Sequence, residues 1–342
     1  MMNKLRYFSV FLLVFGFAHL SPAGEITVAK YAGDFMSNGV GARALGMGGS
    51  FVAVAEGGIS AYWNPAGLAR MNYPQINLMH VERFGGIVKY DFLGISKPYG
   101  ESSTLAFSLA RTGVDDIPIT ALPNPDLPVG AAYEDGQGNL VRNMTYVVKW
   151  TQYMDYVGYL SYARQWKNGW YLGGNVKATY KRAADHSAWG LGFDMSLLGN
   201  PWKSLWVGAT LQDVTTTFLA WDTGRTELIV PTLKWGAAYP FHFYKFRLIP
   251  ALDLNTQFEG IRYGAQAHIG NISFDFHAGA ELSYKNLLAF RVGSNRGRLA
   301  LGAGIHLPRL NIDYAFLSHR ALGATHQISL TLTLEDAKFR RR

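Results

Sequence analysis

Residues Gly39–Ala69 read GVGARALGMGGSFVAVAEGGISAYWNPAGLA, the most distinctive stretch of the chain. Its many glycines allow positive φ angles and close packing of the backbone. The spacing is not that of a nucleotide site, because Phe51 stands three residues after Gly48 where GxGxxG requires glycine, and no GK[ST] follows. The apolar run that begins at Phe51 predicts a short strand, and residues 59–69 predict a short helix or tight turn. The stretch therefore predicts a packed structural plug.

Nine residues form the structural motif of this predicted plug: Gly41, Arg43, Gly46, Gly48, Gly49, Asn64, Pro65, Ala66 and Gly67. Asn64 precedes a proline, so its side chain is expected to bond its own backbone in a turn or to cap the following short helix. Arg43 lies among glycines and needs an acidic partner if it is buried. We expect that partner to be Asp253 or Asp275.

Both ends of the chain resemble FadL-like outer-membrane barrels, and most closely the PorV/PorQ family. GARALGMGGSFVAVA and AYWNPAGLA, within residues 41–69, resemble the N-terminal signature of these barrels. LNIDYAFLSHRALGATHQISLTLTL, residues 310–334, resembles the last two strands of the PorV/PorQ family. The resemblance implies an N-terminal segment that enters a 14-stranded barrel, with the Asn-Pro-Ala element of residues 64–66 inside it.

The first 24 residues have the order of a secretory signal peptide: basic residues, an apolar run and then small residues. The apolar run Tyr7–Leu20 is short compared with the roughly 20 residues of a spanning helix. We therefore predict a signal peptide over residues 1–24 and one barrel domain over 25–342, with a plug segment at 25–70 and barrel strands at 71–336. The chain contains no cysteine, which excludes a Cys-linked lipid anchor, disulfides and thiolate metal sites.

The composition is typical of a membrane β-barrel. Hydrophobic residues make up 49% of the chain, aromatic residues 14% and charged residues only 16%, against roughly 25% charged residues in a soluble domain. No later stretch is long and apolar enough for a spanning helix. The net charge of +8 does not indicate a nucleic-acid partner, because the basic residues are scattered and no binding motif accompanies them.

Alternating side chains predict many antiparallel strands. In Trp170–Lys181, Leu172 and Val176 share an apolar face while Asn175 and Lys177 share a polar one. Alternation also fits a soluble β-sandwich, but Trp and Tyr gather near the segment ends, as in the aromatic girdles of outer-membrane barrels. At about 10 residues per membrane strand plus turns, the chain accommodates about 14 strands. We predict an all-β transmembrane antiparallel barrel.

Two long segments interrupt this pattern. Thr112–Val141 is rich in proline, which argues against a central strand, and Thr215–Pro231 contains a tryptophan and several charges. Long loops of outer-membrane barrels lie on the extracellular side. Both segments are candidates for binding surfaces, and lid or packing loops without a partner are the alternative.

Charged side chains on the barrel strands are expected in the lumen, because Lys or Arg facing lipid would cost about 2–4 kcal/mol near the membrane midplane. We favour a structural hydrogen-bonded network over substrate recognition for these groups. The predicted luminal polar residues are Asn175, Lys177, Asp194, Asp253, Asp275, His277 and Asp313. The histidines show no metal-ligand spacing and no GxSxG motif occurs, so we expect neither an enzyme nor a bound metal or cofactor.

The PorV/PorQ resemblance implies a protein of the cell outer membrane that serves type IX secretion, receiving exported cargo proteins and passing them to secretion-complex subunits. The alternative is a FadL-like channel for hydrophobic small molecules, and a purely structural barrel is a third possibility. In all three cases outer-membrane lipid surrounds the barrel. The final strand ends either at Leu334, with a periplasmic tail, or at Phe339.

Overall fold

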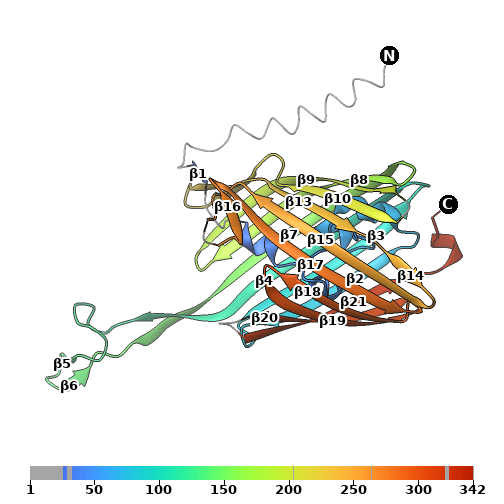
Figure 1. Cartoon of the computed structure of the whole chain (residues 1–342). Coiled ribbons are helices and arrows are strands. Elements are labelled where there is room, and N and C mark those ends of the chain that lie inside the picture. Colours follow the sequence, from blue (N-terminus) through green and yellow to red (C-terminus); the bar gives the residue numbers. More distant parts are fainter. Residues whose placement is uncertain (1–25, 29–32, 203, 263, 320–322, 342) are drawn as a thin grey trace, which may run out of the picture.

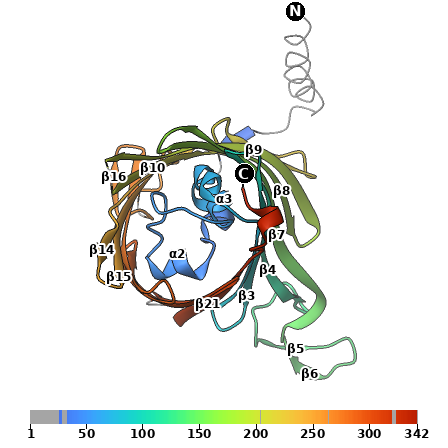
Figure 2. The same cartoon turned by 90° about the vertical axis from the view of Figure 1, so that its right-hand side faces the viewer.

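The computed structural model describes residues 26–28, 33–202, 204–262, 264–319 and 323–341. Within these residues fourteen antiparallel strands close into a barrel, which confirms the predicted fold. The barrel surrounds part of the N-terminal region (Figures 1 and 2). No helix among the described residues is long and apolar enough to cross a membrane. The signal peptide predicted over residues 1–24 lies outside the described part of the chain.

The barrel strands pair in chain order, and the last one pairs with the first. They are β2 (Gln75–Arg83), β3 (Val88–Tyr99), β4 (Ser103–Ala121), β7 (Tyr146–Lys167), β8 (Trp170–Ala183), β9 (His186–Trp202), β10 (Leu205–Gln212), β13 (Thr232–Ala238), β15 (Phe246–Gln257), β17 (Ile272–Tyr284), β18 (Leu288–Asn295), β19 (Arg298–Leu307), β20 (Leu310–His319) and β21 (Gly323–Thr333). Shorter strands lie at the barrel rims or beyond them: β1 (Ile26–Val28), β5 (Ala132–Glu134), β6 (Leu140–Arg142), β11 (Thr217–Trp221), β12 (Thr226–Ile229), β14 (Phe241–Phe243) and β16 (Ala267–Ile269).

Side chains alternate between the two faces of the wall, as a strand requires. On β8, Leu172 and Val176 point outward and are 42% and 41% exposed, whereas Lys177 is 2% exposed. Outward aromatic rings form a row near one end of the barrel, where Tyr180 lies 6.3 Å from Tyr156 and 4.5 Å from Trp189. These contacts match the aromatic girdle of outer-membrane barrels.

The two ends of the barrel differ in their connections. At one end the strands are joined by short turns, and the C-terminal residues lie there (Figure 1). We call this the short-turn end, and the opposite end the long-loop end. At the long-loop end β4 and β7 continue beyond the barrel as a two-stranded arm that carries β5 and β6 (Figure 1). In outer-membrane barrels short turns face the periplasm and long loops face outward.

Both of the segments predicted as loops contain paired strands. Strand β4 continues to Ala121 and includes Pro118, opposite Trp150 of β7. Its pairing with β3 stops at Gly113, so Pro118 lies in an edge strand, where proline is tolerated. In the second segment β11 and β12 form a hairpin that pairs with β9. The segments with these proline and charge patterns therefore contain strands at the rim of the barrel and beyond it, rather than irregular loops alone.

The N-terminal region inside the barrel contains only short helices, η1 (Asp34–Ser37), α2 (Ala42–Gly46), α3 (Ser60–Trp63) and η2 (Pro65–Arg70). We call residues 33–71 the luminal segment. The strand predicted from Phe51 is wrong: residues 52–54 form a turn, because the backbone amides there bond a side chain of the wall instead of another strand. The final strand ends at Thr333, and Phe339 lies in a separate 3-10 helix, η3 (Ala337–Phe339).

Candidate functional site in the barrel lumen

Glycines of the wall make room for the backbone of the luminal segment. A Cβ atom at Gly293 of β18 would lie 2.3 Å from the backbone nitrogen of Gly48. A Cβ at Gly279 of β17 would lie 2.2 Å from the Met47 carbonyl oxygen, and one at Gly173 of β8 would lie 2.2 Å from the Ala66 nitrogen. Real Cβ contacts are never so short, so these wall positions accept only glycine without movement. The wall and the luminal segment fit each other through main-chain contact.

Gly48 of the luminal segment also accepts only glycine. Its φ angle is +67°, and a Cβ there would lie 2.6 Å from the backbone nitrogen of Ser294. Gly41 and Gly49 also have positive φ angles, +83° and +82°. The glycine cluster of the sequence therefore meets the glycines of the wall. Among the remaining motif residues, a Cβ at Gly46 would lie 3.0 Å from the Cα of Gly302.

Arg43 is held by acids other than those predicted. Its guanidinium donates to Glu281 of β17 at 2.8 and 2.9 Å and to Glu56 of the luminal segment at 2.6 Å. Asp253 and Asp275 are therefore not its partners. Both have other partners, and Glu281 lies closer along the wall to the position of α2. The sequence pattern could not distinguish these acids, since all three alternate onto the inner face of their strands.

The Arg43 contact is part of a larger buried network. The Arg291 side chain, fully buried, donates to Glu281 at 2.6 Å and to the predicted luminal residue Asp313 at 2.7 Å. Although burial by itself would raise the pKa of the Glu56 carboxyl, Arg43, Arg70 and Arg247 lower it to about 2. Glu56 is therefore ionised at neutral pH. Ion pairs thus connect the luminal segment to β17, β18 and β20.

A second buried network surrounds Lys177. Its ammonium group donates to Asp213 at 2.7 Å and lies 2.8 Å from Asp194. Asn175 donates to Asp194 at 2.9 Å and to the carbonyl oxygen of Ala61 in α3 at 2.8 Å. The predicted residues on β8 and β9 are thus brought together, and one of them bonds the luminal segment directly.

Asp253 and Asn64 hold the turn at residues 51–55. The Asp253 carboxylate accepts hydrogen bonds from the backbone amides of Phe51 and Val52 at 2.7 and 2.8 Å. The Asn64 side chain donates to the carbonyl oxygens of Val52 and Leu197 at 2.9 and 3.1 Å. It also accepts from the Ala66 amide at 3.2 Å, which is the N-cap expected before a helix that starts with Pro65.

Asp275 and His277 lie nearer the long-loop end. Asp275 forms an ion pair with Arg296 at 3.1 Å. The Nδ1 atom of His277 lies 2.8 Å from the carbonyl oxygen of Gly48, and its Nε2 lies 3.1 Å from the Asn255 side chain. His277 therefore contacts the luminal segment, whereas Asp275 pairs with Arg296 at the rim of the barrel.

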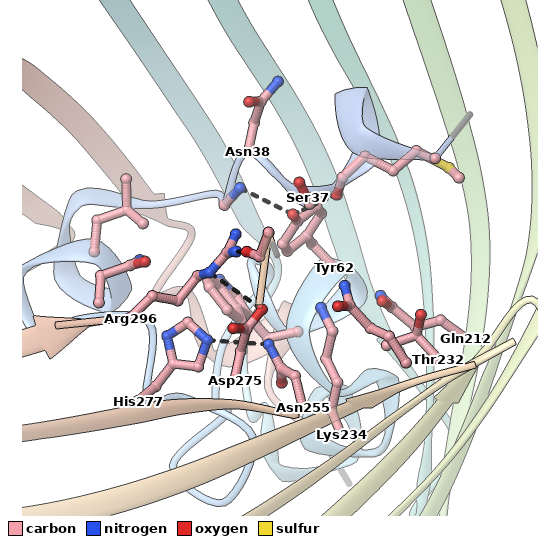
Figure 3. Close-up of a pocket in the computed structure, with 18 of the residues that line it drawn as sticks. Ser37, Asn38, Tyr62, Gln212, Thr232, Lys234, Asn255, Asp275, His277 and Arg296 are labelled. Atoms are coloured by element: carbon pink, nitrogen blue, oxygen red, sulfur yellow. Dashed lines mark hydrogen bonds and ion pairs between the residues drawn. The ribbon is translucent and has the colours of Figure 1, made fainter. Parts of the chain in front are cut away.

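A cavity of about 380 Å³ opens on the long-loop side of the luminal segment. Figure 3 shows Lys234 in this cavity, with Thr232, Gln212 and Asn255 nearby. The Lys234 side chain is only 7% exposed, and among the described residues no hydrogen bond or ion pair holds its ammonium group. It lies 5.9 Å from the ring of Tyr62 and 5.8 Å from that of Trp63. The apolar part of the lining comes from Met36, Leu45, Tyr62, Trp63, Ile229 and Ile261.

A second cavity of about 420 Å³ lies on the short-turn side of the same segment. Its lining is polar and includes Arg43, Glu56, Arg70 and Arg247. Because residues of the luminal segment line both cavities, this segment separates them. Its action as a plug against passage stays a prediction.

A third hollow lies on the outer surface of the wall, across β10, β13, β15 and β17. Its volume is about 480 Å³ and its outer lining is apolar, with Val207, Trp235, Leu252 and Phe276. We call it the wall groove. At its base are Gly208, Gly236, Asp253 and His277. His277 also lines the cavity that contains Lys234, so this one residue borders both spaces.

The residues of the lumen that escaped the sequence analysis include Lys234, Glu281 and Arg291. Each lies on the inward register of its strand, and this alternation is the signal that would have found them. Among the described residues no group of three or more His, Asp or Glu side chains could hold a metal ion.

No protein-family model and no curated protein sequence matches the chain. Several solved structures are nevertheless similar to it in fold. The toluene transporter TbuX of Ralstonia pickettii superposes with a TM-score of 0.55 at 13% identity, over 86% of this chain and 97% of that one. The monoaromatic hydrocarbon channel CymD gives a TM-score of 0.56 at 13% identity, over 87% and 98%.

The chain has a FadL-like barrel fold. The toluene transporter TodX of Pseudomonas putida has the same fold, with a TM-score of 0.50 at 12% identity over 86% of this chain and 97% of that one. At such low identity the likeness concerns the fold alone. It matches the FadL-like part of the resemblance seen in the sequence, and these structures are transport barrels rather than enzymes. The narrower PorV/PorQ assignment stays a prediction.

Proposed function

We propose that this protein is an outer-membrane channel for small hydrophobic molecules, exported by a signal peptide over residues 1–24. The observation that carries the proposal is the position of His277 between the cavity that contains Lys234 and the wall groove. The similar barrels TbuX, CymD and TodX are described as transporters or channels for toluene and other monoaromatic hydrocarbons.

The cavity favours a ligand with an apolar body and one polar or anionic group. Met36, Ile229 and Ile261 provide apolar contact. Among the described residues no hydrogen bond or ion pair holds the buried ammonium group of Lys234, and a buried charge of this kind gains from a hydrogen-bond acceptor on a ligand. The rest of the lining is rich in polar groups, such as Gln212, Thr232 and Asn255, which can hold the polar end of a ligand.

The wall groove is the proposed exit. Gly208 and Gly236 have no side chains at the base of the groove, and the backbone of Val52 and Ala53 lies directly behind them. The proposed path therefore passes beside this turn, at His277. A hydrophobic molecule that passes His277 reaches a surface lined by Trp235, Leu252 and Phe276, which faces lipid. This route avoids the second cavity, whose lining is polar and charged.

Replacing His277 with Trp tests this route. The larger ring is expected to fill the space between cavity and groove, and to reduce uptake of radiolabelled toluenesulfonate, an aromatic anion that does not cross lipid unaided, into proteoliposomes to the level of protein-free liposomes. The matched control is His242→Trp, because His242 is exposed on β14 and borders neither space. Uptake that is equal in the His277 variant and in the unchanged protein would contradict the proposed route.

A second candidate function is the type IX secretion role implied by the PorV/PorQ resemblance. The observation in its favour is the arm at the long-loop end, whose apolar side chains are unusually exposed. Leu140 is 77% exposed, Trp150 63% and Val129 61%. Such residues on a projecting arm are typical of a protein-binding surface. Secreted cargo proteins and secretion-complex subunits are the partners expected in this case.

The arm can be removed without disturbing the barrel. Gly113 and Met154 are paired where the arm leaves the barrel, so an Asn-Gly turn can replace residues 114–153 at this point. In the secretion hypothesis this variant no longer recovers secreted proteins in a pull-down from outer-membrane extract, whereas toluenesulfonate uptake is unchanged. Equal recovery with and without the arm argues against the secretion role, and co-purified apolar molecules would favour the channel.

A further inference from the structure

The C-terminal tail returns to the point where the luminal segment leaves the barrel. Strand β21 ends at Thr333, opposite Gln75 of β2, and the tail then follows the chain that leads into β2. The Leu334 amide donates to the Pro74 carbonyl oxygen at 2.9 Å, and the Arg341 amide donates to the Asn72 carbonyl oxygen at 2.8 Å. The tail therefore runs beside residues 72–74 at the short-turn end (Figure 1).

Arg341 connects three parts of the chain. Its guanidinium donates to the carbonyl oxygen of Ala69 at 2.8 Å and to the Thr104 hydroxyl at 2.6 Å. Ala69 lies in the last turn of η2, and Thr104 lies at the start of β4. Carbonyl groups at a helix end lack partners inside the helix, and a cation satisfies them well. One side chain thus ties the end of the luminal segment to the barrel wall.

The tail is held by these bonds and hardly by burial. Its helix η3 contains no buried residue, and Leu334 and Phe339 are 45% and 38% exposed. The luminal segment beneath it is different, because Leu68, Ala69 and Met71 are at most 5% exposed. A contact made of a few hydrogen bonds opens more readily than the barrel around it.

We propose that residues 334–341 form a latch that closes the exit of the luminal segment, with Arg341 as its fastening residue. When the latch is closed, residues 66–73 are fixed between the lumen and the rim. When it opens, this end of the luminal segment loosens while the barrel strands stay paired. The latch is independent of the proposed transport function, because it concerns the local stability of residues 66–73.

Hydrogen exchange of the full-length protein in lipid nanodiscs tests the latch. In Arg341→Ala the amides of residues 66–73 are expected to exchange about tenfold faster, as the loss of charge-assisted bonds implies, while the strand amides do not change. The matched control is Arg340→Ala, because the Arg340 side chain is exposed, lies next to Arg341 and forms no hydrogen bond or ion pair with a described residue of the luminal segment. Unchanged exchange in Arg341→Ala, or equal acceleration over the whole barrel, would overturn the proposal.

A single reactive thiol provides a second readout. The chain has no cysteine, so Met71→Cys introduces a unique one at a side chain that is only 5% exposed. Combining it with Arg341→Ala is expected to accelerate maleimide labelling by about the same tenfold factor. Arg341→Lys should restore part of the protection, because lysine can reach one acceptor but does not have the planar fork that bridges two. A labelling rate that is the same with arginine and with alanine at residue 341 would also refute the latch.

Discussion

Glu281→Ala is expected to destabilise the folded barrel by about 3–5 kcal/mol, the usual cost of removing one partner from a buried ion pair. Glu281 is 1% exposed and accepts from Arg43 and Arg291, and Arg291 is itself fully buried. Without the carboxylate, Arg43 keeps only Glu56 and Arg291 keeps only Asp313 as a close acidic partner. Urea unfolding in lipid vesicles, followed by the fluorescence of the nine tryptophans, measures the change.

Two further variants separate the charge effect from a packing effect. Glu281→Gln keeps the volume of the side chain but removes its charge, and is expected to destabilise the barrel nearly as much as Glu281→Ala. Asp185→Ala breaks the exposed pair with Lys149 and should leave the unfolding midpoint unchanged. If Glu281→Ala behaved like Asp185→Ala, the buried network would not stabilise the fold.

Gly293→Val is expected to push the luminal segment away from the wall, at a cost of about 1–3 kcal/mol or more for overpacking. The new Cβ would meet the backbone nitrogen of Gly48 at 2.3 Å, and a main chain cannot move aside as a flexible side chain can. The same unfolding experiment measures stability, and limited proteolysis reports whether residues near Gly48 become accessible.

Gly158→Val is the matched control for this substitution. Gly158 lies on β7, and the nearest atom to a Cβ there is the Ala178 carbonyl oxygen at 3.9 Å. The side chain therefore fits without movement, and β propensity favours valine in a strand. Equal stability of the two glycine variants would show that the close approach of wall and luminal segment is not required.

Local sequence patterns predicted the barrel well. The alternation in residues 170–181 identifies both faces of β8, and the total length limits the strand number to about fourteen. Asn64 before Pro65 was correctly interpreted as a turn or cap residue, since that conformation depends only on neighbouring residues. Information of this kind is contained within a few positions of the chain.

Contacts between distant residues could not be predicted in the same way. Arg43 and Glu281 are separated by 238 positions, and three inward acids were equally plausible partners for the arginine. Pro118 was taken as evidence against a central strand, and it lies in an edge strand, but the sequence does not show where β3 stops pairing with β4. The edge or centre position of a strand depends on its neighbours, which only the folded barrel specifies.

The fit between the wall glycines and the luminal segment also has a consequence for the order of assembly. Gly48 contacts Gly293, and the Ala42 amide donates to Ser329, 287 positions further along the chain. These contacts cannot form until almost the whole chain has left the ribosome and reached the membrane. The final contacts of the luminal segment therefore form only after the last strands have arrived. A barrel of this kind folds around its own beginning, so the slow step of its biogenesis is expected at the β2–β21 seam.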